Sequence, residues 1–174
     1  MRRINILGSA GSGKSTLARR LGEVLHLPII HLDQLFWGPG WKKADKAVFR
    51  QRVEQAVRGD AWICEGNYPS QTFALRMPRA ELTVWLDIPR LICALRVARL
   101  SMRTTDRPDL PAGCRQGNVK NAVELVRDAW QFDAQQRARI EAEFAHCSAA
   151  STITRLRSGD EIADFLSSVR AHHR

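Results

Sequence analysis

Short apolar runs alternate with segments of helical periodicity along almost the whole chain. The apolar runs have the length of strands buried in a sheet and cover residues 4–7, 28–33, 61–64, 82–87 and 151–156. Between them, apolar residues recur every three or four positions, which predicts helices over residues 15–26, 45–58, a stretch after Pro89, about 119–145, and from Asp160 onward. This alternation indicates an α/β fold in three layers, a parallel sheet with helices on both faces.

Three stretches interrupt the pattern. Residues 34–41 are rich in aromatic and turn residues, residues 69–80 show no clear period, and residues 104–118 carry the prolines and glycines of a loop. No repeat, low-complexity tract or linker divides the 174 residues. We therefore predict a single domain over residues 1–174.

The junction between the first predicted strand and the first predicted helix reads G-x-x-x-x-G-K-S. It consists of Gly8, Ser9, Ala10, Gly11, Ser12, Gly13, Lys14 and Ser15, followed by Thr16. Between a strand and a helix, this spacing is typical of a loop whose backbone N–H groups surround a phosphate chain. Lys14 is expected to reach the β- and γ-phosphates, and Ser15 to bind Mg²⁺. The motif predicts a binding site for a nucleoside triphosphate.

Acidic residues stand at the ends of three predicted strands: Asp33, Glu65 and Asp87. Right-handed crossovers bring the carboxyl ends of parallel strands to one edge of the sheet, so these acids should meet the phosphate loop there. Glu65 and Asp87 are rival candidates for holding Mg²⁺. We favour Glu65, because the Gly66-Asn67 turn gives tight backbone access. Either acid could instead be an ordinary cap or loop carboxylate.

Asp33 is the candidate for orienting or deprotonating the hydroxyl of a phosphoryl acceptor. His31 lies two residues earlier on the same predicted strand, but a single histidine is more often a packed core residue. Trp37 and Trp41 could stack on a flat acceptor or close the core, and we favour the core.

Basic residues are dense between Arg90 and Arg107. Enzymes catalyse phosphoryl transfer mainly by positioning and charge neutralisation, so Arg96, Arg99 and Arg103 are candidate nucleotide-binding residues. A solvated basic helix face is the alternative for Arg99 and Arg103. Arg107 lies in the loop 104–118, which could close over the triphosphate and exclude water, and we assign it to catalysis.

Composition limits the setting of this chemistry. The formal net charge of +9 fits nucleic acid, a membrane surface or anionic substrates, and does not choose between them. The four cysteines form no C-x-x-C pair, so we expect free thiols in a reducing cytoplasm rather than a zinc site. No stretch approaches the length of a membrane span.

Over nearly its whole length the chain resembles the adenylate kinase-like and shikimate kinase-like group of small P-loop kinases. Besides the phosphate loop, the resemblance rests on Glu65-Gly66, on Arg96 seven residues after Pro89, and on Arg107-Pro108-Asp109-Leu110. It implies a P-loop NTPase fold with a five-stranded sheet of order 2-3-1-4-5. It also implies an acceptor-side insertion over residues 34–60, a lid over residues 104–118, and a monomer.

A narrower resemblance links the chain to bacterial proteins named DNA topology modulation proteins. It is carried by His31-Leu32-Asp33, Pro39-Gly40-Trp41, Glu65-Gly66-Asn67-Tyr68, and Arg107-Pro108-Asp109 with Gly113-Cys114. That name describes a genetic effect and states no reaction. The chain lacks the Thr-Gly-Asp and Phe-Pro-Arg motifs of adenylate kinases and the Gly-Gly-Gly turn of shikimate kinases. The resemblance to these two kinase families therefore does not identify the acceptor.

These observations predict an ATP- and Mg²⁺-dependent kinase that phosphorylates an unidentified hydroxyl or phosphate acceptor. ATP is expected on residues 8–16, Mg²⁺ at Ser15 and Glu65, the acceptor at Asp33, and Arg107 on the transferring phosphoryl group. The alternative is a nucleic-acid-associated ATPase or binding protein that modulates DNA topology. Net charge and the narrower resemblance support it, but the sequence has no recognition helix, zinc finger or RNA-binding motif.

Overall fold

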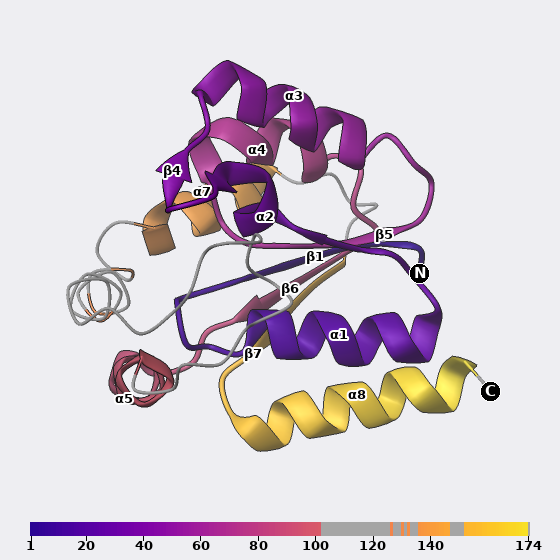
Figure 1. The fold of residues 1–174 in the computed structure, drawn as a ribbon. Helices are drawn as coiled ribbons and strands as arrows, with labels where there is room; N and C mark the ends of the chain where they lie inside the picture. Colours follow the sequence, from indigo (N-terminus) through magenta and orange to yellow (C-terminus); the bar gives the residue numbers. More distant parts are fainter. Residues whose placement is uncertain (102–125, 127–129, 131, 133–135, 147–151, 174) are drawn as a thin grey trace.

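A five-stranded parallel sheet forms the centre of the fold (Figure 1). The computed structural model describes residues 1–101, 126, 130, 132, 136–146 and 152–173. The strands are β1 (Arg3–Gly8), β2 (Ile29–His31), β5 (Trp62–Glu65), β6 (Leu82–Leu86) and β7 (Thr152–Leu156). They pair in parallel in the order β2-β5-β1-β6-β7, which is 2-3-1-4-5 when the strands of this sheet are counted along the chain. The predicted fold class is confirmed.

Helices cover both faces of the sheet (Figure 1). On one face lie α1 (Lys14–Leu25) and α8 (Gly159–His173); on the other lie α3 (Lys46–Ala56), α4 (Pro69–Arg76) and α7 (Ala138–His146). The remaining long helix, α5 (Arg90–Ser101), contributes Cys93 and Val97 to the core cluster that contains the buried side chains of α1. The chain therefore has the three layers expected from its alternating pattern.

The central strand β1 contributes side chains to the core on both faces of the sheet. Ile4 and Ile6 pack with residues of α1 and α8, whereas Leu7 packs with Phe73 of α4 on the opposite face. This division follows from the period of two along a strand. The phosphate loop therefore follows directly from a strand that is packed on both sides.

The second strand ends earlier than predicted. β2 stops at His31, and the next residue begins α2 (Leu32–Phe36), so Asp33 lies in the first turn of a short helix and not at a strand end. Leu32 is fully buried in a cluster with Phe49 of α3, which turns the chain away from the sheet. An acid in the first helical turn is also favoured by the unpaired N–H groups there. The expected strand over 28–33 is wrong in this part.

Two elements form in segments for which the sequence pattern predicted no helix or strand. α4 buries Thr72, Phe73 and Arg76, so most of its buried positions are polar and the apolar repeat is missing. The aromatic segment after α2 forms an antiparallel hairpin of β3 (Trp37–Gly38) and β4 (Lys42–Lys43).

Two predictions lie wholly or partly outside the described residues. The loop 104–118 is not described, and of the helix expected over 119–145 the continuous described part is α7, which ends at His146. Among the described helices, none combines the length and the apolar character that a membrane-spanning helix requires.

Candidate active site

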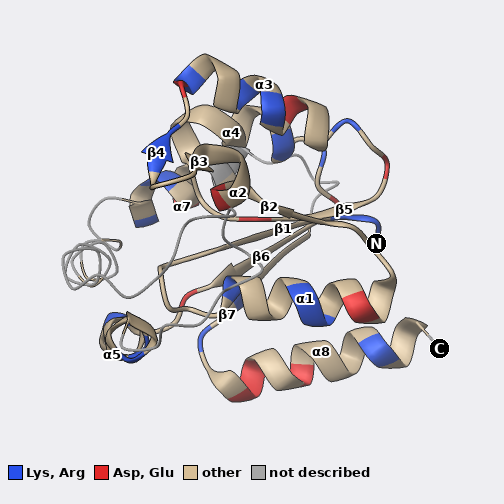
Figure 2. Cartoon of the chain, in the orientation of Figure 1, with Lys and Arg blue, Asp and Glu red and all other residues tan. Residues whose placement is uncertain are grey.

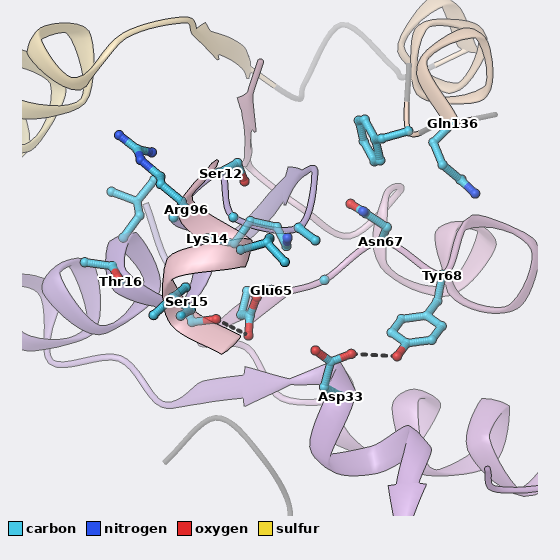
Figure 3. A pocket seen from close by; sticks show the side chains of 18 of the residues that line it. Ser12, Lys14, Ser15, Thr16, Asp33, Glu65, Asn67, Tyr68, Arg96 and Gln136 are labelled. Atoms are coloured by element: carbon cyan, nitrogen blue, oxygen red, sulfur yellow. Dashed lines mark hydrogen bonds between the residues drawn. The ribbon is translucent and has the colours of Figure 1, made fainter. Parts of the chain in front are cut away.

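A cleft of about 1030 Å³ opens where the phosphate loop, the carboxyl end of β5 and the start of α4 meet. Residues of α5 and α7 also line it, and Figure 3 shows this cleft from close by. The structure brings most of the predicted site residues to its wall: Ala10, Gly11, Ser12, Gly13, Lys14, Ser15, Thr16, Asp33, Glu65, Arg96 and Arg99. Arg103 and Arg107 lie outside the described residues.

The phosphate loop is held in a curved form by its glycines and by α5. Gly8, Gly11 and Gly13 all have positive φ, a conformation that side chains with a Cβ disfavour. A Cβ at Gly11 would lie 2.4 Å from the backbone oxygen of Cys93, so the loop packs directly on the α5 backbone. The Lys14 ammonium group donates a 2.9 Å hydrogen bond to the backbone oxygen of Ser9 across the loop. The Lys14 ammonium group and the amino end of α1 therefore both face the concave side of the phosphate loop.

Glu65 lies beside the start of α1. The Ser15 hydroxyl donates to Glu65 Oε1 over 3.2 Å, an interaction drawn in Figure 3. His31 Nδ1 lies 2.8 Å from the same oxygen. All three side chains are at least partly buried, so a hydroxyl, a carboxylate and an imidazole converge on one point at the edge of the cleft. His31 is both packed and bonded to a candidate site acid.

Asp87 has a different environment from Glu65. Its carboxylate binds the guanidinium groups of Arg137 and Arg155, with 2.6 Å from Arg155 Nη2 to Asp87 Oδ2. Both arginines also lie over the ring of Trp85. Asp87 is not among the described residues that line the cleft. The carboxylate, just after β6, therefore links this strand to Arg137, which precedes α7, and to Arg155 of β7.

Asp33 reaches the cleft from α2, opposite the phosphate loop. The Tyr68 hydroxyl donates a 2.6 Å hydrogen bond to Asp33 Oδ1 (Figure 3). Burial raises the pKa of Tyr68, and the negative charge of Asp33 raises it further, so the phenol stays protonated and acts as the donor. Phe36 and Phe49 pack against the Tyr68 ring. Trp41 also lines the cleft, and Trp37 packs against Phe36 and Trp41.

Two residues of this region were not among the site residues predicted from the sequence. The Asn67 side chain exchanges two hydrogen bonds with the backbone of Gly8, and Arg76, which is fully buried, binds the carbonyl oxygens of Gly66 and Asn67. The sequence carried no signal for Arg76, because its burial depends on α4, a helix that the pattern over residues 69–80 did not predict. Once buried, its charged side chain must bind internal acceptors. The partner of Asn67 could not be read from the sequence, since Gly8 is 59 residues away.

Comparison with known proteins identifies the fold. No protein-family model matches the chain, and no curated protein matches it in sequence. Among solved structures, it matches shikimate kinase from Bacteroides thetaiotaomicron with a TM-score of 0.56 and 17% identity, over 98% of this chain and 97% of that one. Shikimate kinase from Acinetobacter baumannii, in complex with shikimate, matches with a TM-score of 0.57 and 17% identity, over 97% and 90%.

A third match, shikimate kinase from Aquifex aeolicus, has a TM-score of 0.51 and 15% identity, over 98% of this chain and 97% of that one. The chain has the fold of these small P-loop kinases over almost their whole length. The narrower resemblance to DNA topology modulation proteins receives no support from these comparisons.

Proposed function

We propose that the protein is an ATP-dependent phosphotransferase that acts on a small acceptor bearing a hydroxyl group. The observation that carries this proposal is the convergence of Lys14, the Ser15–Glu65 pair and Asp33 on one cleft. The fold shared with shikimate kinases supports it. In this reading ATP occupies residues 8–16, and the acceptor occupies the side of the cleft near Asp33.

The chemistry of the donor groups fits Mg²⁺. Mg²⁺ prefers oxygen ligands and is usually held by one or two protein groups together with phosphate oxygens and water. The Ser15 hydroxyl and the Glu65 carboxylate, 3.2 Å apart beside the phosphate loop, are such groups. Bound there, Mg²⁺ would neutralise charge on the β- and γ-phosphates. In this assignment Asp87 keeps a structural role, because its carboxylate already binds two arginines.

The protein groups then have distinct tasks in the transfer. Lys14 and the N–H groups of the loop bind the terminal phosphates and stabilise the charge that moves to ADP. Asp33 orients the acceptor hydroxyl and receives its proton while the oxygen bonds to the γ-phosphorus. The bond from the γ-phosphorus to the β,γ-bridging oxygen breaks, and ADP leaves with that electron pair. Arg96 and Arg99 line the cleft and are proposed nucleotide contacts; Arg107 stays a prediction for the transferring phosphoryl group.

A DNA-directed role stays a prediction without a structural observation in its favour. Figure 2 shows lysine and arginine on helices of both outer layers, including α1, α3 and α8. Among the described residues, such a distribution does not define one docking face for a duplex, which proteins bind through clustered phosphate contacts.

Release of ADP from Mg·ATP, measured across a panel of hydroxyl-bearing metabolites and nucleotides, tests the proposed function. We expect at least one compound to stimulate release in the wild type. Lys14→Ala should lower the stimulated rate by at least about 10²-fold, since it removes a charge aimed at the transferring group. Lys46→Ala, an exposed lysine on α3, serves as the control. A Lys14→Ala rate equal to that of the wild type would contradict the proposal.

Asp33→Asn separates binding from transfer. The substitution keeps the shape of the side chain and removes the proton acceptor, so transfer should fall while Mg·ATP affinity is retained. Loss of Mg·ATP affinity in this variant would show that Asp33 belongs to the nucleotide site and that its assigned role is wrong.

A further inference from the structure

The Asn67 side chain holds the start of the phosphate loop. The Gly8 N–H donates to Asn67 Oδ1 over 3.1 Å, and Asn67 Nδ2 donates to the Gly8 carbonyl oxygen over 2.9 Å. The carboxamide of Asn67 thus pairs with both polar groups of Gly8. Because the Gly8 N–H is engaged in this way, the N–H groups that face a phosphate chain are those that follow it in the loop. By holding Gly8, Asn67 fixes the direction in which the following part of the phosphate loop leaves β1.

The next residue, Tyr68, contacts the opposite side of the cleft. Its hydroxyl donates to Asp33 over 2.6 Å. The Tyr68 backbone has φ 44° and ψ 52° at the amino end of α4, a left-handed conformation that is uncommon for a residue with a side chain. Such a conformation persists only where surrounding contacts hold it. Here it directs the Asn67 side chain to the phosphate loop and the Tyr68 side chain to Asp33.

Arg76 and Thr72 hold this turn, and the Thr72 hydroxyl donates to the backbone oxygens of Asn67 and Tyr68. Arg76 makes the shorter contacts. Its Nη2 donates to the carbonyl oxygens of Gly66 and Asn67, each over 2.6 Å. Its Nη1 donates to Asn5 Oδ1 over 3.1 Å, and Asn5 lies on β1, the strand that leads into the phosphate loop. Arg76 is fully buried, so these bonds are shielded from water. The turn and the loop are therefore fixed to one internal guanidinium group.

We propose that Asn67 and Tyr68 are positioning residues that hold the phosphate loop and the Asp33 carboxylate in register across the cleft. Asn67 acts on the nucleotide side through Gly8, and Tyr68 acts on the acceptor side through Asp33. The proposal rests on the proposed function, because the two residues would set the distance between the phosphoryl group of the donor and the hydroxyl of the acceptor. In-line transfer depends steeply on that distance.

The nucleotide side is tested by calorimetric titration of Mg·ATP into Asn67 variants. Asn67→Ala removes both hydrogen bonds to Gly8, and Asn67→Asp removes the one donated by Nδ2 and places a negative charge at the loop. We expect affinity to fall about three- to tenfold in Asn67→Ala and further in Asn67→Asp. Gln51→Glu, an exposed amide-to-acid change on α3, is the matched control and should bind as the wild type does. Equal affinity in wild type and Asn67→Ala would overturn the nucleotide half of the proposal.

The link between the two sides has a spectroscopic signature, because Tyr68 is the single tyrosine of the chain. With tyrosine labelled at Cζ, the protein gives one NMR signal from the ring carbon bonded to the hydroxyl. We expect Mg·ATP to shift this signal in the wild type and to shift it less in Asn67→Ala. An identical response in both proteins would overturn the link. Unchanged thermal unfolding of Asn67→Ala would establish that a smaller response does not reflect general loss of structure.

The acceptor side is tested by a double-mutant cycle on transfer to the compound that stimulates ADP release. Tyr68→Phe keeps the ring packing and removes the hydrogen bond to the Asp33 carboxylate, so it should lower kcat about tenfold with unchanged Mg·ATP affinity. In the Asp33→Asn background the same change should cost little, because its effect acts through Asp33. An equal cost in both backgrounds would refute the role of Tyr68. If the wild type binds no Mg·ATP, the proposed function itself fails, whereas wild-type binding with unaffected variants refutes the positioning roles alone.

Discussion

His31 and Glu65 are register partners on neighbouring parallel strands, and their side chains meet with 2.8 Å between Nδ1 and Oε1. The carboxylate accepts, so Nδ1 carries the proton of this hydrogen bond. Glu65 Oε1 is shared with the Ser15 hydroxyl, and among the described residues no hydrogen bond engages Oε2. His31 therefore fixes the orientation of the carboxylate that we assign to Mg²⁺. Residues that hydrogen-bond to metal ligands commonly orient them in this way.

Replacing His31 should weaken the metal site without altering the fold. His31→Ala frees the Glu65 carboxylate to rotate, and loss of such a supporting partner typically lowers metal affinity about tenfold or more. The measurement is the Mg²⁺ concentration required for half-maximal ATP binding. His173→Ala, on an exposed turn of α8, is the control. An unchanged Mg²⁺ requirement in His31→Ala would show that the contact serves packing alone.

Glu65 and Asp87 should respond differently to loss of charge. Glu65→Gln should raise the Mg²⁺ requirement for ATP binding and change the free energy of unfolding little. Asp87→Asn leaves Arg137 and Arg155 without their carboxylate, so it should destabilise the fold, by about 1–3 kcal/mol, and leave the Mg²⁺ requirement as in the wild type. Urea unfolding and Mg²⁺ titration separate the two effects. The reverse pattern would assign the metal to Asp87.

The single tyrosine predicts how stability depends on alkaline pH. Burial and the nearby Asp33 charge raise the pKa of Tyr68 above its usual value of 10.0. The unfolded chain therefore loses this proton before the folded chain does, and the contribution to stability, complete below about pH 10, declines as the pH rises further. As the pH rises, tyrosinate absorbance should appear only when the protein unfolds. Asp33→Asn should lower the pKa of Tyr68. Ionisation near pH 10 in the native wild type would contradict the buried hydrogen bond.

Two glycines of the phosphate loop should tolerate alanine to different extents. Both have positive φ, but a Cβ at Gly11 would clash with the Cys93 backbone oxygen, whereas one at Gly13 meets nothing within 4 Å. Gly13→Ala should cost about 1–2 kcal/mol of unfolding free energy from backbone strain alone, and Gly11→Ala should cost more. Urea unfolding without nucleotide measures this difference. Equal costs would mean that the loop does not pack on α5 as described.

The parts of the molecule that the sequence predicted are those fixed by local pattern. The glycine spacing before Lys14, the buried strand that ends at Glu65 and the alternation of strands and helices each depend on residues close together in the chain. Strand order came from resemblance to known kinases and agrees with the structure. Asp33 was assigned to the correct edge but to the wrong element, because the burial of Leu32 against α3 is a tertiary effect.

The contacts that connect the site could not be predicted, since they join distant residues. Asn67 and Gly8 are 59 residues apart, Tyr68 and Asp33 are 35 apart, and Arg155 and Asp87 are 68 apart. No local pattern encodes such pairs, because which side chains meet depends on the register of the sheet and on the direction in which a turn points them. The alternative Mg²⁺ assignment to Asp87 stayed open from sequence for the same reason.

Titration calorimetry of Mg·ATP into the folded protein tests the central claim, that the loop before α1 binds a triphosphate, most directly. We predict measurable binding to the wild type and to Lys46→Ala, and at least about tenfold weaker binding to Lys14→Ala, since Lys14 supplies the positive side chain of the loop. Absence of binding heat in the wild type, with protein verified as folded and nucleotide recovered intact, would contradict the account.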